Sequence, residues 1–81
     1  MNDVKKLIDN IDKLHTTELG LKRIKRNLSL DTDDVIKWCK QVICSTNSTF
    51  ILNGKNWYIH NEKCIITVNA HSFTVITAHK K

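Results

Sequence analysis

The chain contains few residues that break or cross-link protein structure. Its 81 residues include no proline, two glycines and three cysteines. With so little proline and glycine, no flexible linker is evident, and a chain of this length supports one hydrophobic core of modest size. We therefore expect a single domain over residues 1–81. The odd number of cysteines, placed inside predicted helices and strands, argues against a disulfide framework and favours a reducing, cytoplasmic location.

Long apolar runs and late acidic residues are also missing. No apolar run approaches the roughly 20 residues of a membrane helix, and the charges spaced through residues 1–14 exclude a signal peptide, so we expect no membrane partner. The net charge is +5, and Glu62 is the only acid after residue 34. The positive excess therefore lies in the second half of the chain. Such a surface suits a phosphate backbone or an acidic partner, and it equally suits plain solubility.

The scarcity of late acids, glycines and paired cysteines excludes several kinds of catalytic site. Carboxylate pairs and a Ser-His-Asp arrangement lack acids in the second half of the chain, and the isolated Gly20 and Gly54 form no phosphate loop. The cysteines lack paired Cys-x-x-Cys spacing, so we expect core cysteines and neither a metal nor a cofactor. An enzyme built from this inventory would use His, Arg, Lys and hydroxyl groups. Metal-independent RNA cleavage, in which the 2′-OH is the nucleophile and cations stabilise the transition state, fits that inventory.

Three helices are predicted in the first half of the chain. Apolar residues recur at helical spacing within residues 4–14, 21–28 and 35–43. Thr16 or Thr17 is expected to cap the second helix, and Asp31 or Thr32 the third.

The last third of the chain predicts an antiparallel meander of four strands. Two-residue turns at Asn53-Gly54, Asn61-Glu62 and Ala70-His71 would separate its β-rich runs and assign every side chain to a face. The face expected to meet the helices holds Phe50, Leu52, Trp57, Ile59, Cys64, Ile66, Val68, Phe73, Val75, Thr77 and His79. The opposite face holds Ile51, Asn56, Tyr58, His60, Lys63, Ile65, Thr67, Asn69, Thr74, Ile76 and Ala78. We expect an α+β fold in which three N-terminal helices pack on one face of a four-stranded antiparallel meander.

The face turned away from the helices is a candidate binding surface. In the predicted register Tyr58, Ile65 and Ile76 form a row across neighbouring strands, and a contiguous apolar row indicates contact with a partner. A homodimer through this row is one possibility. A nucleic acid is the other, with Tyr58 stacking on a base while His60 and Lys63 meet phosphate.

A second group of residues offers proton transfer and phosphate binding. His15 lies between two predicted helices, and Arg23 and Arg26 follow in the second helix, where their guanidinium groups suit a phosphate. Thr77 and His79 end the last strand on the helix-facing side, and a histidine there suits general acid–base chemistry. The plain alternatives are an exposed capping segment around His15 and a frayed chain end at His79. A shared cleft for His15, Arg23 and His79 would favour a catalytic site, whereas scattered positions would favour an interaction module.

Two regions of the chain, residues 15–28 and three short stretches within residues 56–79, resemble a known family. They read HTTELGLKRIKRNL at residues 15–28, and NWY, IITVN and VITAH at residues 56–58, 65–69 and 75–79. They resemble the bacterial family called domain of unknown function 3781, and the resemblance implies no activity. A looser similarity to the barnase–EndoU–colicin–RelE ribonucleases and toxins rests on element order and on a Thr-containing last strand like Ile76-Thr77.

Together these features predict RNA binding or metal-independent RNA cleavage. Arg23, Arg26 and Lys63 would contact phosphate, and His15 or His79 would transfer protons. The alternative is a non-catalytic interaction module, which forms a homodimer or binds an acidic protein through the face turned away from the helices.

Overall fold

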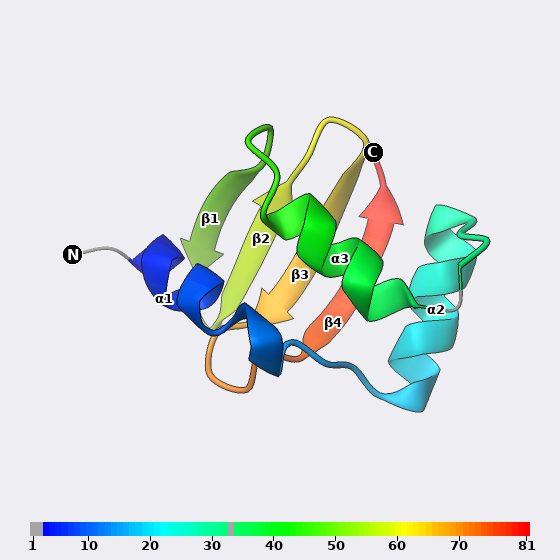
Figure 1. Ribbon diagram of the computed structural model, residues 1–81, viewed down its shortest axis with the longest axis horizontal. Coiled ribbons are helices and arrows are strands. Elements are labelled where there is room, and N and C mark those ends of the chain that lie inside the picture. Colours follow the sequence, from blue (N-terminus) through cyan, green and yellow to red (C-terminus); the bar gives the residue numbers. More distant parts are fainter. Residues whose placement is uncertain (1–2, 33) are drawn as a thin grey trace.

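The computed structural model describes residues 3–32 and 34–81. The elements in order are α1 (Asp3–Asp9), the 3₁₀ turn η1 (Ile11–Lys13), α2 (Glu18–Leu28), α3 (Val35–Ile43), β1 (Thr49–Asn53), β2 (Asn56–His60), β3 (Cys64–Asn69) and β4 (Val75–Lys80). The strands form one antiparallel sheet in the order β1-β2-β3-β4; α1 and α3 cover one face, and α2 lies beside β4 (Figure 1). The predicted α+β architecture is confirmed. None of the helices in the described ranges is long and apolar enough to cross a membrane.

The helix starts follow local capping chemistry. Thr17 caps α2, as predicted, through a side chain that accepts a hydrogen bond from the backbone in the first turn. The cap of α3 is Asp34, whose carboxylate accepts a 3.1 Å hydrogen bond from the Lys37 N–H, so the expectation of Asp31 or Thr32 was wrong. The first predicted helix is shorter than expected, because α1 ends before the separate turn η1.

The turns between β1, β2 and β3 have two residues each and come one position later than predicted, at Gly54-Lys55 and Glu62-Lys63. Gly54 has a φ of +65°, and a glycine with positive φ in the first position of a two-residue turn is the type II′ pattern. Moving such a turn by one residue changes each pairing by two positions. The side chains of β1, β2 and β3 therefore lie on their predicted faces.

The last hairpin differs from its prediction in the length of its loop. The loop has four residues, 70–73, in place of a two-residue turn at Ala70-His71, and the Asn69 N–H donates to the Thr74 carbonyl at 2.9 Å across its base. The Asn69 side chain also accepts hydrogen bonds from the backbone of His71 and Ser72, both at 2.9 Å. One polar side chain thus organises this loop.

A β-bulge in β4 then exchanges the faces of the last strand. Val75 pairs with Val68, but Thr77 pairs with Thr67, which leaves Ile76 as an extra residue. An extra residue moves every later side chain to the other face.

This bulge overturns part of the predicted face assignment. Ala78, opposite Ile66, faces the helices and is fully buried. Thr77 and His79 lie on the other face, so their predicted position on the helix-facing side was wrong.

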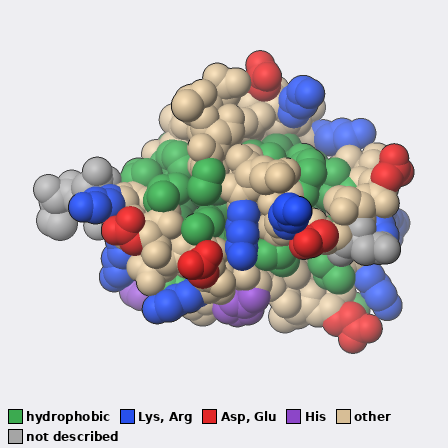
Figure 2. All heavy atoms as spheres, in the orientation of Figure 1, with side chains coloured by type: hydrophobic (Ala, Val, Ile, Leu, Met, Phe, Trp, Pro, Cys, Tyr) green, Lys and Arg blue, Asp and Glu red, His purple; other side chains and the backbone are tan. Residues whose placement is uncertain are grey.

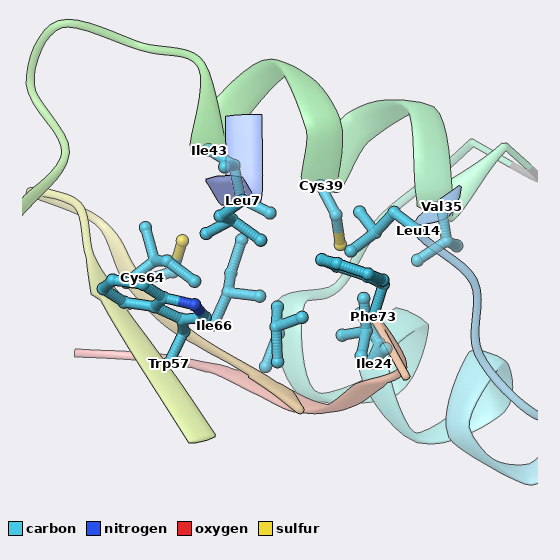
Figure 3. Packing of buried hydrophobic residues seen from close by; sticks show 14 of the residues in the cluster. Leu7, Leu14, Ile24, Val35, Cys39, Ile43, Trp57, Cys64, Ile66 and Phe73 are labelled. Atoms are coloured by element: carbon cyan, nitrogen blue, oxygen red, sulfur yellow. The ribbon is translucent and has the colours of Figure 1, made fainter. Parts of the chain in front are cut away.

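The hydrophobic core fills the space between α1, α3, the inner side of α2 and the covered face of the sheet (Figure 3). Fully enclosed members include Ile24, Cys39, Ile59, Ile66 and Val68, each with no exposed surface. Cys39 points down from α3 toward the segment that leads into β4. Removing this apolar surface from water is the main favourable contribution to folding.

Candidate nucleic-acid interface

His15 belongs to a segment that extends the sheet beside β4. Its N–H donates to the Phe73 carbonyl at 3.1 Å, and its carbonyl accepts from the Val75 N–H at 2.7 Å. In the ring, Nδ1 lies 2.8 Å from the Lys13 carbonyl and Nε2 lies 3.1 Å from the Thr74 hydroxyl. Because a carbonyl only accepts, Nδ1 donates the proton in the contact with Lys13. These contacts give His15 a structural role at the start of β4.

Two of the predicted catalytic residues, His15 and His79, lie far apart along β4. His15 bridges to Thr74, whereas His79 lies five positions further along the chain, close to the end of β4. At the rise of an extended strand this separation is roughly 15 Å. Thr77 lies between them in sequence but opposite Thr67 on the face away from the helices. The structure therefore separates His15 from His79.

On the face without helices, which we call the open face, the described strands place no acidic side chain. Its strand residues are Thr49, Ile51, Asn53, Asn56, Tyr58, His60, Ile65, Thr67, Asn69, Thr77 and His79. The helix side, by contrast, shows acidic and basic side chains interspersed (Figure 2). An anionic ligand would therefore meet no carboxylate on the strands of the open face.

Two transverse rows cross the open face. In one row Ile65 lies between His60 and His79, and in the other Thr67 lies between Tyr58 and Thr77. The apolar row of Tyr58, Ile65 and Ile76 predicted from the sequence is therefore not formed. Ile76 stands at the bulge with 41% of its surface exposed.

Two side chains, one from the segment just before α2 and one from α2 itself, hydrogen-bond to the edge of β4. The Thr16 hydroxyl donates to the Val75 carbonyl at 2.8 Å, and the Asn27 amide donates to the Ala78 carbonyl at 3.2 Å. Both carbonyls would otherwise point into solvent, because β4 is an edge strand.

The cations of α2 border the open face. Successive helix residues are about 100° apart, so Leu21 and Asn27 lie on opposite sides of the buried face of α2. Leu21 packs against the core, and Asn27 hydrogen-bonds to the edge of β4. Arg23 follows on the Asn27 side, Arg26 and Lys22 lie on the outer side of the helix, and all three are exposed. They line a shallow depression on the helix. The predicted phosphate ligands Arg23 and Arg26 thus lie next to each other, away from α3.

Lys63 does not join this surface. It lies in the β2–β3 turn and lines a depression with Trp38 and Lys80 on the helix side of the sheet. Of the predicted nucleic-acid contacts, the structure places Tyr58 and His60 on the open face and Arg23 and Arg26 at its border. The bulge in β4 also places His79 on the open face, opposite Ile65. No turn signal in the sequence predicts this bulge.

The buried thiols are poor nucleophiles. Burial raises the pKa of Cys39 to about 12. Burial also raises the pKa of the Cys64 thiol, and the nearby Lys81 ammonium opposes this shift in part. Both thiols therefore stay protonated at neutral pH, where the thiolate is the reactive form. Within residues 4–32 and 34–81, no three His, Cys, Asp or Glu side chains gather as a metal site requires.

Comparison with known proteins gives one match. A family model described as "Protein of unknown function (DUF3781)" matches residues 8–79. No curated protein and no solved structure matches the chain. The looser likeness to small ribonucleases accordingly finds no support.

Proposed function

Since the chain belongs to the DUF3781 family, whose function is unknown, we propose a function from its geometry: it binds single-stranded RNA through the open face, without cleaving it. The observation that carries the proposal is the absence of acidic strand residues around Tyr58 on a sheet face that no described element covers. An exposed antiparallel sheet with aromatic and polar side chains is a common platform for unpaired bases.

Tyr58 supplies the stacking surface in this proposal. It lies on β2, one of the two central strands, with Ile51 on one side and Thr67 on the other. Stacking of a base on an aromatic ring contributes about 1–3 kcal/mol and tolerates any base. The imidazoles of His60 and His79 lie one row away, on either side of Ile65, where their nitrogens can bond base edges or phosphate.

The exposed cations of α2 supply the phosphate contacts. Lys22, Arg23 and Arg26 line one shallow depression on α2, the helix that lies beside β4 at the edge of the open face. With three phosphates neutralised, the logarithm of the binding constant would fall against the logarithm of salt concentration with a slope of about −2.

We propose binding without cleavage because the proton-transfer groups are separated. General acid–base cleavage of RNA needs two groups within hydrogen-bond reach of one phosphodiester. His15 is bonded to Thr74 and Lys13 at the start of β4, far from His79 near its end.

Fluorescence anisotropy with a labelled single-stranded RNA, measured across a KCl series, tests the proposal. We expect Tyr58→Ala to weaken binding about tenfold, the effect of losing one stacked base. Arg23→Gln should reduce the salt slope by about 0.7, as expected for one lost phosphate contact. Lys37→Gln, which removes an exposed cation from α3 on the helix side, is the matched control and should leave the slope unchanged.

Two results would overturn the proposal. One is a wild-type protein that fails to bind RNA at low salt. The other is binding that Tyr58→Ala leaves intact and that polyglutamate captures equally well, which would indicate an acidic protein partner.

A further inference from the structure

The edge formed by β1 has no backbone partner among the described residues, although the opposite edge of the sheet is bonded along much of its length. In β1, the residues Asn53, Ile51 and Thr49 lie opposite Asn56, Tyr58 and His60. Residues that flank a two-residue turn exchange both backbone hydrogen bonds, and bonded pairs then alternate along the ladder. The N–H and C=O groups of Phe50 and Leu52 therefore point away from β2.

The same strand lacks the features that usually prevent edge pairing. Its sequence, TFILN, has no charge and no proline, and its pairing with β2 contains no bulge. Ile51 is 47% exposed and Leu52 is 43% exposed. Natural edge strands are guarded by lysines, prolines or bulges, because an unguarded edge accepts another strand.

We propose that β1 pairs with β1 of a second copy of this chain, in antiparallel orientation about a two-fold axis at Ile51. In that register Phe50 of each copy lies opposite Leu52 of the other, so the outward N–H and C=O groups of both residues bond each other. The two Ile51 side chains meet on the open face. Phe50 and Leu52 of the two copies meet on the helix side. One short strand thus satisfies all its free backbone groups with an identical partner, as a two-fold interface requires.

Charge also favours a second copy as the occupant. The exposed cations of α2 lie beside β4, at the opposite edge of the sheet from β1 (Figure 1). In the proposed pair the two α2 helices stand at the far ends, so the like charges of the two copies are widely separated and screened. The strands that meet are uncharged.

The expected association is weak and reversible. Pairing of one short strand buries less than the ~1,200 Å² of a standard stable interface. It joins the two open faces into one continuous surface. The pairing does not depend on RNA, and a test without RNA separates its failure from failure of the proposed function.

Sedimentation equilibrium over a wide range of protein concentration tests the inference. We expect the wild type to associate as its concentration rises and Ile51→Lys to remain monomeric, because like charges would face each other at the axis. Ile76→Lys is the matched control: Ile76 is nearly as exposed as Ile51, at 41% against 47%, but lies on β4. It should associate like the wild type. Circular dichroism checks that both variants are folded.

Charge reversal gives a sharper test of the register. Ile51→Lys and Ile51→Glu should each be monomeric alone and should associate when mixed, since opposite charges then meet at the axis. Amide exchange at Phe50 and Leu52 should slow as wild-type concentration rises, whereas exchange at Ile51, already bonded to β2, should not change. A wild type that stays monomeric, or equal effects of the two lysine variants, would overturn the inference.

Discussion

The first and last hairpins stand at opposite edges of one sheet and are built differently. The β1–β2 hairpin has a two-residue turn, a regular ladder and an open edge. The β3–β4 hairpin has a four-residue loop, a bulge and a covered edge. The regular hairpin is set by its own turn. The irregular one is adjusted to segments that precede it by about sixty positions in sequence.

The covered edge shows what the bulge accommodates. The Val75 N–H and carbonyl bond to His15 and Thr16, and the Ala78 carbonyl bonds to Asn27. The extra residue, Ile76, lies between these two bonded positions. A β-bulge increases the local twist of its strand, and such a twist lets one strand meet both the Leu14–Thr16 segment and α2. The change of register in β4 thus lies where the strand contacts distant segments of the chain and not in the loop that connects it to β3.

The largest expected effect comes from placing a charge at each of the two residues that follow the bulge. Ala78 has no exposed surface and faces the core, whereas Thr77 lies on the open face. Ala78→Glu should lower the free energy of unfolding by at least about 3 kcal/mol, because a larger, charged side chain enters a packed interior. Thr77→Glu should change it by less than about 1 kcal/mol. Urea unfolding of both variants measures the difference.

This pair of variants distinguishes the observed register from a regular one. In a hairpin without the bulge, Thr77 would face the core and Ala78 would face solvent. The two effects would then be exchanged. A tolerated Ala78→Glu would contradict the bulge.

The regular parts of the fold follow from the sequence because their causes are local. Helical spacing predicts the three helices. The first turn lies between Asn53 and Asn56, and placing it one residue too early shifts each strand pairing by two positions, which leaves the faces unchanged. The cap at Asp34 was missed because Asp31 and Thr32 offer the same chemistry nearby. The bulge at Ile76 was missed because nothing in residues 69–79 records the contacts that α2 makes with β4.

The burial of Cys39 on the helix side of the sheet gives a second prediction. Figure 3 shows Cys39 above Phe73, the residue that leads into β4. Burial raises the pKa of the Cys39 thiol from 9.0 to about 12. Below about pH 9 the folded and unfolded states both keep this proton, so stability is unaffected. Between about pH 9 and pH 12 only the unfolded chain releases it, and the free energy of unfolding falls by about 2 kcal/mol by roughly pH 10.5.

Chemical denaturation at about pH 8 and about pH 10.5, for the wild type and for Cys39→Ala, measures this contribution. Other groups titrate over the same range in both proteins, so the informative quantity is the difference between their pH dependences. We expect the loss on raising the pH to be about 2 kcal/mol smaller in Cys39→Ala. Equal losses would mean that water reaches the thiol above the covered hairpin.

The candidate site was only partly predictable, for the same reason as the last strand. Tyr58 and His60 were placed correctly because alternation on β2 fixes their face once the turn is within one residue. Arg23 and Arg26 were recognised by charge, but their position beside the open face depends on how Asn27 fastens α2. His79 was assigned to the wrong face because of the bulge.

The smallest expected effect concerns the closure of the β4 edge at Gly20. This buried glycine lies in the first turn of α2, and an added Cβ would overlap the Thr16 hydroxyl and come 3.1 Å from that of Thr17. Replacing glycine by alanine inside a helix ordinarily stabilises it by about 1 kcal/mol. Here we expect Gly20→Ala to destabilise the protein by about 1 kcal/mol, because Thr16 must move and lose its hydrogen bond to Val75.

A double-mutant cycle with Thr16→Ala separates the two opposing effects, measured as free energies of unfolding in urea. Thr16→Ala removes the hydroxyl that the new methyl would strike, so in that background Gly20→Ala should regain its ordinary favourable sign. The change of sign arises only if α2 approaches the edge of β4 as closely as the Thr16–Val75 hydrogen bond requires. If Gly20→Ala stabilised the otherwise unaltered protein, α2 would not be held at that distance, and the β4 edge would be nearly as open as that of β1.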